Sequence, residues 1–208
     1  HCKNSEINMP NGNTIPSDQP KTVVTSTVLS GGTEISSSYH VLSIVVNKEV
    51  NRIPSASIVI SDGDAAAQNF EISNKADFEP GKEIEIKLGY QSSEETVFKG
   101  IVVKHSIKTR KKNSVLMIEC RDKAAKMTAT CKGKYFKEVK DSDVMEELID
   151  SYGLDKEVEA TTVDHKQLVQ YNTTDWDFVL CRADVNGLLC IADDGKIKIA
   201  KPDFAAAS

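Results

Sequence analysis

The sequence has no long hydrophobic run and few aromatic residues. No stretch approaches the roughly 20 apolar residues that a membrane-spanning helix needs, and aromatic residues make up 6% of the 208-residue chain. Residues 1–20 are polar and contain three prolines, so we expect a flexible N-terminal arm, or residues added by cloning, and no signal peptide. We therefore expect a protein that is made in the cytoplasm and does not insert directly into a membrane.

Cysteines at metal-binding or disulfide spacing are also missing. The five cysteines, at positions 2, 120, 131, 181 and 190, include no CxxC pair, which argues against a zinc ribbon and against a disulfide framework. Cys120, Cys181 and Cys190 have apolar neighbours, and we expect them to be small hydrophobic residues of the core. This pattern fits a reducing compartment.

No catalytic or cofactor motif is recognisable. GxSxG, Walker, HExxH and GxGxxG patterns are absent. We expect His40 and His105 to be ordinary strand residues, and His165 not to form a dyad with Asp164, because adjacent residues of an extended chain point to opposite sides. The pair Asp193-Asp194 could suggest calcium, but a hairpin turn explains it more simply. We predict no catalytic, cofactor-binding or metal-binding residues and no cofactor.

The charge balance argues against a nucleic-acid partner. The formal net charge is -5, whereas a general nucleic-acid binder usually presents a basic face. One basic cluster exists, formed by Lys104, Lys108 and residues 110–112. It lacks interleaved aromatic residues for stacking bases, so we interpret it as a solvated hairpin tip.

Short runs of β-branched residues dominate the first half of the chain. KTVVTSTVLS (21–30), YHVLSIVVN (39–47) and ASIVISD (56–62) are predicted strands, and Gly31-Gly32 predicts a hairpin or loop between the first two. Neither face of the first run is cleanly apolar, so we expect that strand at an edge or against another subunit. Residues 65–70 are expected to form a short helical turn.

The stretch FEPGKEIEIKLGYQSSEETVFKGIV (78–102) predicts two strands, each preceded by a turn. Pro80-Gly81 suits the centre of a type II turn, and Gly100 indicates a bulge or a close backbone approach. A polar tip at 110–113 precedes a further strand, SVLMIECRD (114–122). Four apolar residues alternate with charged ones and are expected to face the core: Ile84, Ile86, Leu88 and Tyr90.

Two helices and a hairpin are predicted in the second half. Ser142 or Asp143 can cap a helix that Gly153 ends. Thr174 and Asp177 have capping-box spacing at the start of a second helix, which Asn186-Gly187 ends. LLCIADDGKIKIA (188–200) predicts a hairpin with a type I′ turn at Asp194-Gly195.

These patterns together predict an α+β fold dominated by β-structure. We expect an antiparallel, partly closed barrel with two short helices and a C-terminal hairpin. The predicted divisions are a β-barrel domain at 21–135, a helix-containing α+β subdomain at 136–204, and residues left by cloning at 205–208.

Three stretches carry a family resemblance. DFEPGKEIEIKLGY with VFKGIV, ECRDKAAKM, and LVQYNTTDWDFVLCRADVNGLLCIADDGKI resemble the Vgr proteins of type VI secretion systems. They also resemble related hub proteins of contractile phage tails and spike-base proteins of extracellular injection particles. The last stretch is the most specific, and its matching residues are Gln170, Trp176-Asp177-Phe178, Arg182, Asn186-Gly187 and the Asp-Asp-Gly turn.

The resemblance, which runs from about Val23 to Phe204, implies a phage tail hub-like fold and a structural, non-enzymatic role. Members of that family form trimeric spikes or baseplate hubs that adapt a hexameric tube to a trimeric spike. It implies as partners further copies of the protein, the tail-tube hexamer, baseplate components, and spike-tip or effector proteins. Such hubs are assembled in the bacterial cytoplasm and ejected with the apparatus. Full members continue into an OB-type domain and a needle, which this sequence does not include.

Two other classes of function stay open. A β-rich recognition module could bind glycan or peptide at an exposed edge strand, and it would need a solvent-facing aromatic platform. A hydrolase would need convergent polar residues with perturbed pKa values in a cleft.

Overall fold

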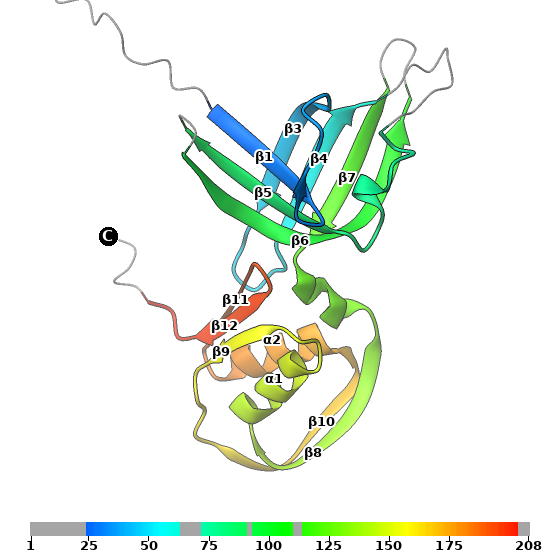
Figure 1. The fold of residues 1–208 in the computed structure, drawn as a ribbon. Coiled ribbons are helices and arrows are strands. Elements are labelled where there is room, and N and C mark those ends of the chain that lie inside the picture. The colour runs from blue at the N-terminus through cyan, green and yellow to red at the C-terminus, as the bar shows by residue number, and fades with distance from the viewer. Residues whose placement is uncertain (1–23, 63–71, 91–92, 110–113, 204–208) are drawn as a thin grey trace, which may run out of the picture.

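The computed structural model describes residues 24–62, 72–90, 93–109 and 114–203. Four expectations lie outside these residues: the N-terminal arm at 1–20, the helical turn at 65–70, the polar tip at 110–113 and the cloning residues at 205–208. Figure 1 shows a curled sheet above a smaller body that contains two helices.

The larger sheet has seven strands in the order β2-β1-β5-β6-β7-β4-β3, and every neighbouring pair is antiparallel. The sheet does not close into a barrel, because β2 and β3 end it on opposite sides. The fold is therefore β-dominated and partly closed, as predicted. Its strands are β1 (Val24–Ser30), β2 (Thr33–Glu34), β3 (His40–Asn47), β4 (Ser55–Ser61), β5 (Glu83–Tyr90), β6 (Ser93–Lys108) and β7 (Val115–Arg121).

Turn chemistry sets the entry into β5. The amide of Lys82 donates to the carbonyl of Glu79 at 3.1 Å, and Gly81 has φ 95°. This is the predicted type II turn, in which glycine accepts the positive φ at the second central position. A short 3-10 helix, η1 (Ala76–Phe78), precedes it and buries Phe78.

The alternation of β5 is confirmed for part of the strand. Ile84 and Ile86 are buried and Leu88 is half-buried, whereas Tyr90 is 60% exposed. The prediction that Tyr90 faces the core is wrong. Tyr90 pairs with Val24 at the end of β1, and Val24 is itself exposed, so the end of the sheet extends past the packed core.

Gly100 of β6 marks a close backbone approach, as predicted. A Cβ atom at this position would lie 2.3 Å from the carbonyl oxygen of Arg121. The register of β6 also shifts between Ile86 and Lys87 of β5 and between Val102 and Lys104 beside β7. Such irregularities increase local twist, and they let the 16-residue strand β6 bend with the curled sheet.

The smaller body contains two further sheets and two α-helices. β8 (Cys131–Lys140) and β10 (Asp164–Thr174) form an antiparallel ribbon, and β11 (Leu189–Asp193), β12 (Lys196–Ala200) and β9 (Asp155–Val158) form a three-stranded sheet. The β9–β12 pair is parallel, which the sequence patterns did not predict. The chain between these two strands includes β10, α2 and β11, so no simple strand-helix-strand repeat marks the pairing. The predicted C-terminal hairpin is β11–β12, with φ 52° at Asp194 and 84° at Gly195.

Helix α1 (Asp141–Asp150) begins earlier than predicted. Ser142 and Asp143 lie inside its first turn, and the Asp143 carboxylate accepts a long hydrogen bond from the Lys140 amide at 3.4 Å. The expected cap position was therefore wrong, while the ending at Gly153, with φ 64°, agrees with the prediction. A 3-10 helix, η2 (Lys123–Thr128), joins the two bodies.

Helix α2 (Asp175–Val185) has the predicted boundaries. The hydroxyl of Thr174 accepts from the Asp177 amide at 3.1 Å, and Gly187 has φ 65° just after the helix. None of the described helices is long and apolar enough to cross a membrane.

The described residues pack into two hydrophobic cores. The sheet core lies inside the seven-stranded sheet, around Ile58, Ile86 and Phe98. The helix core surrounds Met145 and Val179 of the smaller body. The domain boundary at residue 135 stays a prediction.

The cysteines divide between core and surface. Cys120 lies in the sheet core and Cys190 in the helix core, as predicted, and burial raises the pKa of each thiol to about 12. Cys181 is exposed, so its predicted core position is wrong. It lies on the outer face of α2 with Asp177 and Asp184. The apolar residues next to it in sequence do not indicate that this face is exposed.

Candidate functional site

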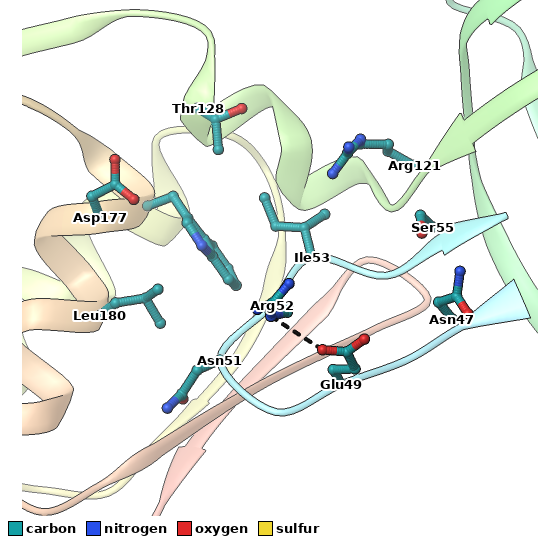
Figure 2. A pocket seen from close by; sticks show the side chains of 11 residues that line it. Asn47, Glu49, Asn51, Arg52, Ile53, Ser55, Arg121, Thr128, Asp177 and Leu180 are labelled. Atoms are coloured by element: carbon teal, nitrogen blue, oxygen red, sulfur yellow. Dashed lines mark ion pairs between the residues drawn. The ribbon is translucent and has the colours of Figure 1, made fainter.

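A polar groove of about 510 Å³ lies between the two bodies. The loop between β3 and β4 forms one wall, and α2 and η2 form the other (Figure 2). Ile53, Trp176 and Leu180 supply its apolar part. Its polar lining consists of Asn47, Glu49, Asn51, Arg52, Ser55, Arg121, Thr128 and Asp177.

The lining of this inter-body groove offers no catalytic group in a working arrangement. Glu49 forms an ion pair with Arg52 at 3.1 Å, and both side chains are exposed. The groove lining contains no histidine or cysteine that could act as base or nucleophile. The arrangement can bind a polar chain through amide, hydroxyl and guanidinium groups.

A buried carboxylate lies at the start of α1. The Asp141 carboxylate accepts from Arg182 Nε at 2.5 Å, from Asn186 Nδ2 at 2.9 Å and from His165 Nε2 at 3.0 Å. Burial alone would raise the pKa of Asp141, but these hydrogen bonds outweigh it and lower the pKa to about 2. No described hydroxyl or thiol bonds to His165, so this cluster fastens β10 and α2 to α1 and does not form a nucleophilic triad.

A second buried carboxylate lies at the start of α2. Asp175 has no exposed surface and accepts from Lys132 Nζ at 2.6 Å, from the Tyr152 hydroxyl at 2.6 Å and from Gln170 Nε2 at 2.8 Å. Burial acts to raise the pKa of Asp175, and the hydrogen bonds from Gln170, Lys132 and Tyr152 lower it overall. The same contact with Asp175 raises the pKa of Lys132 to about 12. This network joins β8, β10 and α2.

The Asp-Asp-Gly turn fastens the smaller body to the larger sheet. Lys48 forms an ion pair with Asp193, and the Asp194 carboxylate accepts from the Lys99 amide at 2.8 Å. The Gly195 amide donates to the buried Asp122 carboxylate at 2.9 Å. The turn is therefore the predicted hairpin tip, and it makes a structural contact on β6.

The histidines occupy ordinary positions. His40 is exposed on β3, and His105 Nδ1 lies 3.0 Å from the Phe78 carbonyl oxygen. No group of three or more His, Cys, Asp or Glu side chains in the described ranges could hold a metal ion. The absence of catalytic, cofactor-binding and metal-binding residues in the whole chain stays a prediction.

Several residues of the resemblance form these structural networks. Gln170 contacts Asp175, while Arg182 and Asn186 contact Asp141. Asp141 itself was not predicted from the sequence. Its partners lie 24 to 45 positions away along the chain, so only the fold brings them together.

Among the described strands, the larger sheet ends at β2 on one side and at β3 on the other. No described strand pairs with the outer edge of β3, and β2 covers only Leu29 and Ser30 of β1. β1 therefore lies next to an edge, as expected from its mixed faces. β3 has no Lys, Arg, Asp or Glu along its eight residues, and Leu42 and Val45 are exposed. A groove of about 500 Å³ beside Leu42 also includes Val59 and Met117.

Solved structures with the same fold include phage tail and type VI secretion proteins. The 43 kDa tail protein of prophage MuSo2 from Shewanella oneidensis is 14% identical with a TM-score of 0.66, over 87% of this chain and 54% of that chain. The c3393 protein of E. coli, a component of the type VI secretion system, is 12% identical with a TM-score of 0.63, over 83% and 48%. A Francisella PdpA-VgrG complex is 10% identical with a TM-score of 0.59, over 90% and 33%.

These likenesses show a shared fold. The chain spans about half the length of the first two structures and a third of the last. No curated protein matches the sequence at a significant level. The family profile described as the Alg8 N-terminal domain matches residues 20–208. The chain therefore belongs to the Alg8 N-terminal domain family.

Proposed function

We propose that this chain is a structural component of the hub of a contractile injection machine, and that it acts as part of a homotrimer between a hexameric tube and a trimeric spike. The fold that it shares with phage tail proteins and a type VI secretion component supports this role. More narrowly, we propose that this hub is a Vgr-type spike of a type VI secretion system.

The open seven-stranded sheet is the observation that carries the proposal. An edge strand presents unpaired N–H and C=O groups, and monomeric proteins usually protect such edges with charges, proline or bulges. The register of β3 against β4 shifts between Val41 and Ser43, but β3 has no Lys, Arg, Asp, Glu or proline over eight residues, and it exposes Leu42 and Val45. Such an edge suits a chain that continues its sheet into another subunit.

The proposed role requires rigid walls and no reaction chemistry. The two buried carboxylates, Asp141 and Asp175, are each held by three hydrogen-bond donors. These networks stiffen the smaller body, and all the contacts of these two buried carboxylates are structural ones within the chain. We propose a non-enzymatic function on this basis.

The proposed partners are further copies of the chain, the tail-tube hexamer, baseplate components and a spike-tip or effector protein. One solved structure of the same fold is a PdpA-VgrG complex, which supports a partner protein of the last kind. Assembly in the bacterial cytoplasm, ejection with the apparatus and the division into domains at 21–135 and 136–204 belong to the same proposal.

Native mass spectrometry of the protein tests the assembly. We expect a species of three copies, and Val45→Lys should dissociate it by placing a charge beside the free edge of β3. Val50→Lys is the matched control, because Val50 is equally exposed, at 49%, and lies in the loop after β3. A protein that stays monomeric at the highest soluble concentration would contradict the trimeric hub.

A glycan- or peptide-binding module is the second candidate. Trp176 is buried and cannot form an aromatic platform, but Tyr135 and Tyr171 are exposed on the same ribbon. Glycan-array binding that disappears in Tyr171→Ser would favour this candidate.

A further inference from the structure

The ribbon of β8 and β10 has one buried face and one exposed apolar face. Phe136 packs inward and stacks on Phe178 with ring centroids 6.1 Å apart. On the outer face, Tyr135 lies directly opposite Val169. Tyr135 is 68% exposed and Tyr171 of the same ribbon is 85% exposed. The ribbon is therefore anchored from inside and presents tyrosines to solvent.

Exposed tyrosines on a rigid strand pair suit a protein interface. A tyrosine supplies a large apolar area at low entropic cost, and aromatic side chains are enriched among the residues that dominate binding. The inner face already anchors the ribbon through Phe136 and Leu168. Packing within the chain therefore does not account for Tyr135 and Tyr171.

The ribbon is also basic within an acidic chain. Its two strands contain five lysines and only two carboxylates, Glu138 and Asp164, while the whole chain has a net charge of -5. Lys132 and Lys134 pair with carboxylates of the same chain. Among the described residues, no ion pair involves Lys137, Lys140 or Lys166. These three lysines and the two carboxylates leave one net positive charge on the ribbon, and Asp164 lies opposite Lys140. The exposed Lys137, close to Tyr135, therefore favours an acidic side chain on the partner.

The outer face of α2 has the complementary character. Asp177, Cys181, Asp184 and Val185 are spaced by four, three and one residues, so they lie on one side of the helix, and all four are exposed. Neither aspartate forms an ion pair with a described residue, and Val185 is 68% exposed. The Asp177 carboxylate accepts a hydrogen bond from the Thr174 hydroxyl at 2.6 Å. This face therefore combines two carboxylates that have no cationic partner with an exposed apolar side chain.

We propose that the outer face of the β8–β10 ribbon docks onto the α2 face of a second copy of the chain. Tyr135 and Tyr171 would pack around Val185, and Lys137 would lie near Asp184. The inference rests on the proposed assembly of several copies and adds the surfaces that meet. Because two different surfaces meet, the contact is heterologous and closes into a ring when the rotation permits.

Sedimentation velocity over a concentration series tests this contact on the 208-residue chain. Lys137→Glu and Asp184→Lys should each weaken self-association at least about tenfold, because each places like charges across the contact. The double variant should regain most of the affinity. Tyr171→Ser should weaken association about 30-fold, as expected for loss of an aromatic anchor.

Lys126→Glu is the matched control. Lys126 is exposed on η2, forms no ion pair with a described residue, and changes the net charge by the same amount. Its association should equal that of the wild type. All the substituted side chains are exposed, and unchanged circular dichroism spectra will verify folding.

The outcomes separate this inference from the proposed function. Assembly that persists in Lys137→Glu and Tyr171→Ser overturns the inference and leaves the hub role intact. A ribbon variant that dissociates the assembly while Asp184→Lys does not overturns α2 as the acceptor. A monomeric wild type overturns both proposals. Ribbon-dependent binding to immobilised polyglutamate without self-association would assign the ribbon to a different acidic chain, which also overturns the inference.

Discussion

Replacing the buried carboxylate of Asp141 should destabilise the protein in a way that depends on pH. The folded pKa is about 2 against an ordinary value of 3.8. At about 1.4 kcal/mol per pKa unit, this difference corresponds to about 2.5 kcal/mol of stability at neutral pH. Asp141→Asn also leaves the Arg182 guanidinium without its counter-ion, so we expect a loss of about 2–4 kcal/mol at neutral pH.

The pH dependence follows from the sign of the shift. A lowered pKa means that the folded state holds the ionised carboxylate more tightly, so its stabilisation is complete above about pH 4 and is lost as the pH falls through 2. The difference between wild type and Asp141→Asn should shrink by about 1 kcal/mol at pH 3 and about 2 kcal/mol at pH 2. Urea denaturation followed by circular dichroism at several pH values measures both quantities.

Glu147→Gln is the control on the same helix. Glu147 pairs with Lys134 at 2.5 Å, but both side chains are about half exposed, so the cost should stay below about 1 kcal/mol. The reasoning would be refuted if Asp141→Asn cost no more than this control, or if its cost did not change in acid.

Three further substitutions test the packing. Gly100→Ala places a Cβ 2.3 Å from the Arg121 carbonyl oxygen, so we expect the free energy of unfolding to fall by at least about 2 kcal/mol in thermal melting. An unchanged melting temperature would show that β6 and β7 can move apart at no cost to make room for the methyl group. Lys132→Met leaves the buried Asp175 without its cation and should cost about 3 kcal/mol in urea; a neutral result would mean that Gln170 and Tyr152 suffice. Tyr90→Ser should change stability by less than about 1 kcal/mol because Tyr90 is exposed, and a larger loss would place its ring in the core.

Local patterns were enough to predict most elements of this fold. The turns at Pro80-Gly81 and Asp194-Gly195 and the cap at Thr174 depend on neighbouring residues alone, and the structure confirms them. Alternation predicted the buried faces of the central strands for the same reason. Cys181 and Tyr90 were misplaced because their exposure depends on how far the core extends.

The networks of the smaller body could not be predicted in this way. The resemblance includes Gln170, Arg182 and Asn186, but it did not predict that Gln170 contacts Asp175 or that Arg182 and Asn186 share Asp141. Asp141 receives three donors that lie 24 to 45 positions away, and Asp175 receives Lys132 from 43 positions away. No local rule relates such positions.

The sequence by itself predicted six strands of the larger sheet, the C-terminal hairpin, several turns, the two helices and the absence of a recognisable catalytic motif, because each depends on residues within one or two turns of chain. Only the tertiary structure decided that β8 and β10 form a ribbon, that β9 pairs in parallel with β12, that β3 is the last described strand of the larger sheet, and that the ribbon presents tyrosines opposite its buried face. These features arise from packing between distant segments, where burial and register are settled jointly by both partners.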